Sequence, residues 1–316
     1  MLALPKPDVI LVHESDLDGF VSGLLLRRLA RQLFAEDVRL EAWHTSAWLQ
    51  RPMNEKAAWV ADLTFDPRLD RPGWLVIDHH PPLAAPKHAR LVHDAEKSAS
   101  LLTYEFCLEQ GLERNGAATE RLVRLSNVAD LFQHEHPDFA TACDYAALVK
   151  TYRFWNLHDL IGGELDRLLD HPLLEVAAAK RRVEDPLGVA WSRERIEPLT
   201  DEVAHVPVVV GNRNLIVHQL LQEEASACPV LLTLHRHGNG LFNVSLRSRN
   251  GGALAVATRL QGGGHPNAAG ATLPRTVRQM PEALDYLRRV LAPPSKVPAR
   301  MTGLAGLLET FDEGLK

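Results

Sequence analysis

The sequence predicts an α/β protein with a parallel-sheet N-terminal domain covered by helices and a smaller α/β C-terminal domain with a mixed sheet. In the first half, short apolar stretches alternate with helical patterns, which is typical of βαβ units. The chain has 316 residues, more than one hydrophobic core usually organises. Strand patterns resume after a charged, proline-bearing stretch near 184–198. We therefore expect domains over 1–183 and 204–316, joined by a linker or connecting helix over 184–203.

The N-terminal domain is expected to contain four short strands, in PDVILVH, VRLEAWH, AAWVADLTF and GWLVIDHH. The segment GFVSGLLLRRLARQLF predicts a helix with the apolar residues Val21, Leu24, Leu25 and Leu29 on one side. From about 98 to 182 the pattern is mostly helical. The C-terminal domain is expected to contain strands in VAHVPVVVG, CPVLLTLHRHG and LFNVSLRS, and helices in VHQLLQEEA and ALAVATRLQ. The last stretch, PPSKVPAR followed by MTGLAGLLETF, suggests a mobile link and a short helix.

Composition excludes several classes of protein. No apolar run approaches the roughly 20 residues that span a bilayer, and the N-terminus lacks a signal-peptide pattern, so a cytoplasmic protein without a membrane partner is expected. The three cysteines are far apart, which argues against disulfides and a thiolate zinc site. The formal net charge of −5 argues against a protein that coats long nucleic acid through a broad basic face.

A polar triplet, Asp78, His79 and His80, directly follows the apolar strand pattern of GWLVI and precedes two prolines. It therefore lies at the carboxyl end of a strand. In open α/β sheets that edge is where ligands bind.

Two other expected strands also end in carboxylates. The first finishes in HESDLDG, where His13 precedes Asp16 and Asp18. An extended segment places Asp16 and Asp18 on the same side, because side chains alternate with a period of two. The third finishes with Asp62. Three strand ends thus bring carboxylates and imidazoles to one edge of the sheet.

Such a mixture of oxygen and imidazole ligands suits Mn²⁺ best, and also Mg²⁺, Co²⁺ or Zn²⁺. The candidate ligands exceed the needs of one ion. Two divalent metal ions about 3.5–4 Å apart are the usual solution for displacement at phosphorus. The strand ends therefore predict a two-metal site.

Four motifs, HESDLDGFVSG, VADLTF, VIDHH and GGGHPNAAGA, resemble those of the DHH phosphoesterase superfamily in order and cover most of the chain. That superfamily includes RecJ-type exonucleases, nano-RNases, cyclic-dinucleotide phosphodiesterases, exopolyphosphatases and family II pyrophosphatases. The resemblance implies a DHH catalytic domain with a two-metal site, followed by a DHH-associated domain that carries the glycine-rich motif and binds substrate.

The resemblance also implies a role for each motif residue. His13 and Asp16 would bind one ion, Asp18 and His79 the other, and Asp62 would bridge them; His80 would face the substrate phosphate, Asp78 would orient its neighbours, and Asp130 would be the fourth-motif ligand. Asp138 and Asp144 lie near Asp130 and compete for that last role. The spacing from His13 to Asp16 is one residue shorter than in many nano-RNase-like members, and RecJ-type members often lack that histidine.

In the second domain, Gly262, Gly263 and Gly264 precede His265. Glycines let backbone N–H groups approach phosphate oxygens, and a histidine adds a directed donor. Arg247 fits the position of a family arginine that reaches the substrate, with Arg249 as the competing candidate. The serine-rich helix start at Ser98 has a structural explanation as a cap and no catalytic role is assigned to it. The paired histidines in FQHEHPD and LHRHGNG are expected to be surface residues.

These features predict a manganese-dependent phosphodiesterase that hydrolyses short single-stranded oligonucleotides, or other small phosphoesters, to 5′-mononucleotides. Three alternatives stay open: a cyclic-dinucleotide or phosphoadenosine-phosphate hydrolase, a polyphosphate or pyrophosphate hydrolase, and a non-catalytic nucleotide-binding regulatory protein. A homodimer is also left open.

Overall fold

A computed structural model describes residues 4–113, 116–236 and 240–292 of the chain. It divides into two compact units, Met1–Arg181 and Arg182–Lys316. Residues 184–203 belong to the second unit, where they form the end of helix α7 (Leu173–Arg193), strand β6 (Glu197–Pro198) and the first residue of strand β7 (Val203–His205). The helix expected in MTGLAGLLETF lies outside the described residues.

The N-terminal unit is built on a parallel five-stranded sheet in the order β2-β1-β3-β4-β5. Its strands are β1 (Val9–His13), β2 (Arg39–Trp43), β3 (Ala58–Ala61), β4 (Trp74–Asp78) and β5 (Arg90–His93). The parallel sheet and its covering helices confirm the expected fold class. Strand β5 was not predicted, because the apolar part of its short sequence RLVH is too brief to stand out.

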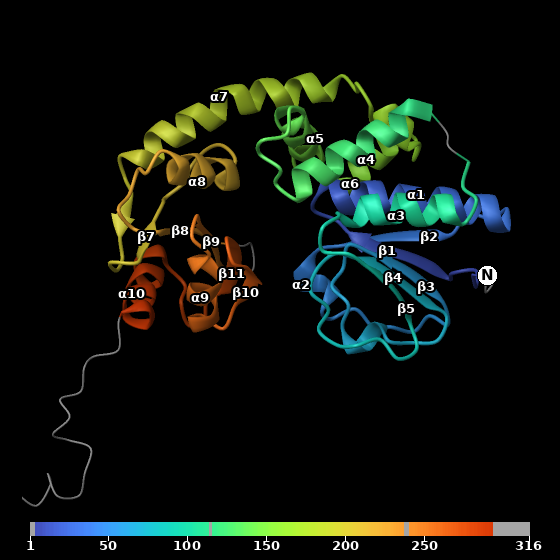
Figure 1. Ribbon diagram of the computed structural model, residues 1–316, viewed down its shortest axis with the longest axis horizontal. Coiled ribbons are helices and arrows are strands. Elements are labelled where there is room, and N and C mark those ends of the chain that lie inside the picture. The colour runs from blue at the N-terminus through green and yellow to red at the C-terminus, as the bar shows by residue number, and fades with distance from the viewer. Residues whose placement is uncertain (1–3, 114–115, 237–239, 293–316) are drawn as a thin grey trace, which may run out of the picture. The chain divides into compact units, whose positions relative to one another are not determined.

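The period-two pattern of the strands divides the core of this unit between the two faces of the sheet. Ile10 and Val12 face one hydrophobic cluster, together with α1 (Leu17–Phe34) and α3 (Ala99–Glu109). Val9 and Leu11 face a second cluster on the opposite side. Figure 1 shows α1 and α3 lying along one face of the sheet. The further elements of this unit are α2 (Thr45–Trp48), η1 (Pro67–Leu69), α4 (Gly116–Asp130), α5 (Phe139–Tyr152), α6 (Phe154–Leu160) and η2 (Leu165–Leu168).

The strand order creates a switch point between β1 and β3. From β1 the chain first moves to β2 on one side and later returns to β3 on the other. In doubly wound sheets the crevice for ligands opens outside the carboxyl ends of the strands at such a point. The topology therefore predicts a ligand-binding site at the residues that follow β1 and β3.

The C-terminal unit holds a six-stranded mixed sheet in the order β10-β11-β9-β8-β7-β6, in which only β7 and β8 pair in parallel. Its other strands are β8 (Val230–Arg236), β9 (Phe242–Ser248), β10 (Gly263–His265) and β11 (Ala268–Thr272). Helix α8 (Arg213–Gln222) packs on one face, and α9 (Gly252–Arg259) and α10 (Met280–Leu291) pack on the other (Figure 1). The mixed sheet was predicted; α10 and the β10–β11 hairpin were not.

The three cysteines are buried and form no disulfide, as expected. Among the helices that the structure describes, none is both long and apolar enough to cross a membrane.

One buried histidine gives the C-terminal unit a pH-dependent stability. Burial lowers the pKa of His205 in β7 to about 4. The His205 imidazole takes up a proton near pH 6.5 in the unfolded chain, but only near pH 4 in the folded chain. The folded state is therefore fully stable above pH 6.5, and its free energy of unfolding decreases as the pH falls toward 4. The loss is at most about 3 kcal/mol. We expect the melting temperature of His205→Gln to depend less on pH than that of the parent between pH 7.5 and 4.5. If the melting temperatures of the parent and of His205→Gln fell by the same amount between pH 7.5 and 4.5, this role of His205 would be wrong.

Candidate functional site

The carboxyl edge of the N-terminal sheet gathers acidic and imidazole side chains from four separate segments. Three groups of residues each have ligand atoms within 4.8 Å of one another: His13, Asp16 and Asp62; Asp62, Asp78, His79 and His80; and Asp18, His79 and Asp130. The structure therefore brings together all eight residues that the sequence suggested for this site, and it links the three groups through Asp62 and His79.

The turn from β1 into α1 holds the first pair. The Asp16 carboxylate caps α1 by accepting a hydrogen bond from Gly19 N (3.0 Å), and it also accepts one from His13 Nδ1 (2.6 Å). A Cβ atom at position 19 would lie 2.2 Å from the His13 carbonyl oxygen, so this turn requires glycine. Burial alone would lower the pKa of His13, but the hydrogen bond with Asp16 and the nearby Asp62 carboxylate raise it to about 11.

Asp62 follows β3 in a left-handed backbone conformation, with φ of 57°. Asparagine and aspartate tolerate this conformation better than most side chains. The turn leaves the side chain almost fully buried, with Oδ2 3.5 Å from His13 Nδ1 and Oδ1 4.0 Å from His79 Nε2. Burial, and then the negative charge of Asp16, raise the pKa of the Asp62 carboxyl well above its usual range. Without a cation, this position is electrostatically unfavourable for a carboxylate.

Strand β4 ends at Asp78, and His79 and His80 directly follow it. The fully buried Asp78 carboxylate accepts a hydrogen bond from His80 Nδ1 (2.9 Å), which fixes the His80 ring. His93, at the end of β5 and paired with Asp78 across the strands, donates from Nε2 to the His80 carbonyl oxygen (3.0 Å). Sequence reasoning missed His93, because only the strand register shows that it lies beside the triplet.

Asp130 at the end of α4 belongs to the site, whereas its two competitors do not. Its Oδ2 lies 3.3 Å from His79 Nε2. Burial, and then the charges of Asp18 and Asp16, raise the pKa of the Asp130 carboxyl well above its usual range. Asp138 instead forms a bidentate pair with Arg121, and Asp144 pairs with Arg181. The geometry thus favours Asp130 among the three aspartates.

The site has unused buried ligand atoms, which is the property expected of a metal centre. Within the described residues, four buried polar atoms here lack a hydrogen-bond partner: Asp62 Oδ2, Asp78 Oδ2, His79 Nε2 and Asp130 Oδ2. Buried acceptors without partners each cost about 1–3 kcal/mol. Divalent cations that take oxygen and imidazole ligands would satisfy these atoms and neutralise the crowded carboxylates. The residues present therefore fit such ions.

In the C-terminal unit, two predicted substrate-binding side chains share one row of the sheet. His265 in β10 pairs with Ala268 in β11, which pairs with Arg247 in β9. Directly opposed residues point to the same face, so Arg247 and His265 lie on one face two strand spacings, or about 10 Å, apart. Burial lowers the pKa of Arg247, whose Nη1 donates to the Leu246 carbonyl oxygen (3.0 Å). Arg249 is exposed and pairs with Glu224 (2.9 Å).

The glycines of the motif have different structural reasons. A Cβ atom at Gly262 would lie 2.1 Å from the Gly270 carbonyl oxygen, and one at Gly264 would lie 2.7 Å from the Ala268 carbonyl oxygen. Gly264 also has a φ of 135°. Gly263 has open space around it and is exposed. Two of the glycines are therefore required by close strand packing, and only Gly263 has no packing reason to lack a side chain.

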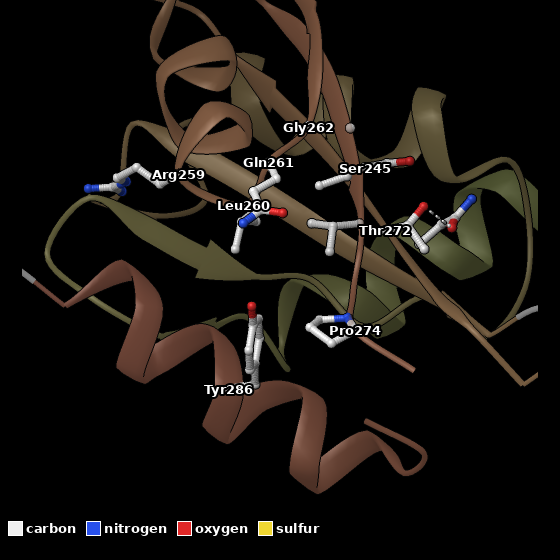
Figure 2. Close-up of a pocket in the computed structure, with 12 residues that line it drawn as sticks. Ser245, Arg259, Leu260, Gln261, Gly262, Thr272, Pro274 and Tyr286 are labelled. Carbon is white, nitrogen blue, oxygen red and sulfur yellow. Dashed lines mark hydrogen bonds between the residues drawn. The ribbon is translucent and has the colours of Figure 1, made fainter. Parts of the chain in front are cut away.

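A hollow of about 690 Å³ lies beside the start of this motif (Figure 2). Gln261, Gly262, Thr272 and Tyr286 are among the residues that line it, and Thr272 Oγ1 donates to Asn243 Oδ1 (3.1 Å) at one side. Of the residues predicted to bind substrate, Gly262 alone contributes to its lining. The hollow is thus distinct from the row that contains Arg247 and His265.

The other described histidines that the sequence singled out belong to none of these groups. In FQHEHPD, His136 Nδ1 accepts a hydrogen bond from Asp138 N (3.1 Å) in an exposed turn. His235 lies in the β8–β9 hairpin, opposite Asn243, and His237 lies outside the described residues.

Comparison with known proteins agrees with the two-unit fold. Residues 212–292 match the family model of the DHHA1 domain. No curated protein matches the chain. Among solved structures, a pGpG-specific phosphodiesterase, PggH from Vibrio cholerae, is 14% identical with a TM-score of 0.53, over 90% of this chain and 99% of the other. RecJ from Thermus thermophilus, in complex with Mn²⁺, is 16% identical with a TM-score of 0.52, over 90% of this chain and 52% of RecJ. The chain therefore spans about half of that RecJ.

A DHH domain from a protein described as a member of a family of ribosomal proteins is 15% identical with a TM-score of 0.58, over 89% of this chain and 87% of the other. The shared fold and the DHHA1 match confirm the resemblance to the DHH phosphoesterase superfamily. Within the C-terminal unit, the similarity to the DHHA1 domain covers residues 212–292.

Proposed function

We propose that the protein is a manganese-dependent phosphodiesterase that hydrolyses short oligonucleotides to 5′-mononucleotides. The observation that carries the proposal is the set of buried, unpartnered ligand atoms at the carboxyl edge of the sheet. Phosphodiester hydrolysis is supported by the activities of two structural neighbours, a pGpG-specific phosphodiesterase and the exonuclease RecJ. The Mn²⁺ complex of RecJ supports the choice of metal.

Two divalent cations would be held by the three linked groups of ligands. His13 and Asp16 would bind one ion, Asp18, His79 and Asp130 the other, and Asp62 would bridge them. When bound, such a pair neutralises charge on the phosphoryl oxygens and makes a water molecule nucleophilic near neutral pH.

His80 would then position the phosphate. Asp78 fixes its Nδ1, and His93 holds its backbone carbonyl group, so the ring has a defined orientation before substrate binds. Its Nε2 can donate to a phosphate oxygen from this fixed position. A side chain that is oriented in advance contributes to the rate because less motion must be frozen in the transition state.

The C-terminal unit would bind another part of the substrate. Arg247 provides a planar guanidinium that suits bidentate contact with phosphate. Its neighbour in the same sheet row, His265, adds a donor, and the exposed backbone at Gly263 can approach an anion closely.

The preferred substrate length tests this function. The net charge is −5, and long nucleic acid needs a basic track because each phosphate contact releases counterions. With Mn²⁺ and single-stranded oligonucleotides of 2 to about 24 residues, we expect turnover to be fastest at about two to five nucleotides, with the salt slope of one or two phosphate contacts. The same assay is run with four other phosphate compounds as competing substrate classes: pGpG, a cyclic dinucleotide, phosphoadenosine phosphate and polyphosphate. Faster hydrolysis of the 24-mer with a steep salt slope, or preference for a non-oligonucleotide substrate, would refute the proposal.

Two nearby arginines test the role of the C-terminal unit. Arg247→Met should raise KM for a dinucleotide about tenfold to a hundredfold, because hydrogen bonds to charged groups contribute about 1.5–3 kcal/mol. Arg249→Met removes an equal charge two residues away, where the arginine is exposed and paired with Glu224, and should leave KM near the parental value. Equal effects of the two substitutions would show that Arg247 acts only through its charge.

A further inference from the structure

The C-terminal end of α4 carries Asp130 and two further residues that hold the surroundings of the candidate metal site, Ser126 and Asn127, and of these three the sequence singled out only Asp130. Ser126 Oγ donates to Asp18 Oδ1 (3.1 Å), and Asn127 Oδ1 accepts from Ser98 N (2.9 Å). Ser126 and Asp130 are four residues apart, which places them on the same face of the helix. One helix face thus contacts both Asp18 and His79, two residues of the same ligand group.

Asp18 itself is almost fully buried and surrounded by donors. Its Oδ1 accepts hydrogen bonds from Ser100 N (3.0 Å) and from Ser126 Oγ (3.1 Å). Its Oδ2 accepts one hydrogen bond, from Ala99 N (2.8 Å). An ionised carboxylate offers about four acceptor positions in all, two on each oxygen. Both positions on Oδ1 are therefore used, and one position remains on Oδ2.

The backbone donors come from the first turn of α3, and that turn is itself held in place. Ser98 caps α3 by accepting from Leu101 N (3.3 Å), and its own N–H group donates to Asn127. Asn127 is adjacent to Ser126 in α4. The same short segment of α4 therefore anchors both the α3 turn and the Asp18 carboxylate.

We propose that Ser126 is a positioning residue for the metal site: with the Ala99 and Ser100 N–H groups, it fixes Asp18 so that only Oδ2 is presented, as a monodentate ligand. This inference rests on the proposed metal-dependent function. Removing the hydroxyl frees one acceptor position on Oδ1 and loosens the carboxylate, while the ligand itself remains. Residues that orient metal ligands in this way typically affect metal affinity by about 10–100-fold.

The test measures Mn²⁺ binding without substrate, by titration of the metal-free full-length protein with free Mn²⁺ followed by electron paramagnetic resonance. In Ser126→Ala, we expect one of two Mn²⁺ equivalents to bind about 10–100-fold more weakly, and the other to be less affected. Ser126→Cys keeps a side chain of similar size with a weak donor, and should give an intermediate affinity. Ser22→Ala is the matched control, because Ser22 is a buried serine on α1 whose hydroxyl has no hydrogen-bond partner among the described residues.

The outcomes separate this inference from the proposed function. A purely structural role would lower the melting temperature of metal-free Ser126→Ala and leave both Mn²⁺ affinities within about twofold of the parent; that result would overturn the inference. An equal loss of affinity in Ser22→Ala would also overturn it. If the parent bound no Mn²⁺, the proposed metal-dependent function would fail instead. Should Ser126→Ala not fold, a parental Mn²⁺ affinity in Ser126→Cys would refute the positioning role.

Discussion

Replacing Asp62 with asparagine is expected to abolish binding of the metal pair and to lower kcat by about a thousandfold or more. Asp62 shares one ligand group with His13 and Asp16, and its Oδ1 lies 4.0 Å from Nε2 of His79, which belongs to the ligand group of the other ion, so we expect its loss to affect both ions. The metal ions stabilise charge in the transition state by several kcal/mol, and the loss of about 4 kcal/mol lowers the rate about a thousandfold. Asparagine keeps the size of the side chain and tolerates the left-handed backbone at this position, so the fold should be retained.

The same substitution should stabilise the metal-free protein. Asp62 is buried, and its burial and the negative charge of Asp16 disfavour the ionised carboxylate, so in the absence of a cation this carboxyl group opposes folding. We expect the melting temperature without metal to rise by about 2–4 °C for each kcal/mol of repulsion removed. Metal content by mass spectrometry and melting curves with and without Mn²⁺ measure both effects.

Asp66→Asn is the matched control for Asp62→Asn. Asp66 lies in the loop after the same strand, caps η1 and pairs with Arg68 (2.6 Å), and belongs to none of the ligand groups. Its replacement should leave metal content and kcat near the parental values. An Asp62→Asn protein that kept two metal ions and near-parental turnover would show that the bridging role is wrong.

Asp130→Asn should remove one of the two metal ions and lower kcat by about a hundredfold. Its Oδ2 is a buried acceptor near His79 Nε2, and among the described residues it has no hydrogen-bond partner to compete with a cation. An amide oxygen is a weaker ligand than a carboxylate because it carries no net charge, and oxygen ligands to divalent cations are mostly charged.

Asp138→Asn distinguishes the fourth-motif residue from its neighbour. Asp138 is already paired with Arg121 at the surface, so its substitution should have little effect on stability and should leave the metal content unchanged. The number of bound metal ions per protein and kcat, measured for Asp130→Asn and Asp138→Asn under the same conditions, would decide between the two aspartates. Loss of an ion in Asp138→Asn, with retention in Asp130→Asn, would reverse the assignment.

Local sequence was sufficient for the main features of the N-terminal sheet. The strands β1, β3 and β4 are short apolar runs, each followed by an acidic residue or turn, and α1 has regular helical spacing. Because parallel strands place their carboxyl ends at one edge, the meeting of Asp16, Asp62 and Asp78 could be predicted without coordinates.

Features that depend on strand register or on contacts between distant segments could not be predicted in this way. His93 lies beside the DHH triplet only because β5 pairs with β4 with His93 opposite Asp78. Asp130 could not be distinguished from Asp138 by spacing, since the difference is that Arg121 pairs with one of them and not with the other. Local sequence patterns do not show which of several neighbouring carboxylates forms an ion pair with an arginine from another part of the chain.

The sequence by itself determined the two-domain α/β class, the motifs and the chemical kind of ligand at the sheet edge, because these depend on periodicity and residue type within short segments. Only the tertiary structure decided that Ser126 and the start of α3 surround Asp18, and that Arg247 and His265 share one sheet row. Ser126 lies 108 positions from Asp18 along the chain. Hydrogen bonds over such separations arise from packing of whole helices and strands, which no local pattern specifies.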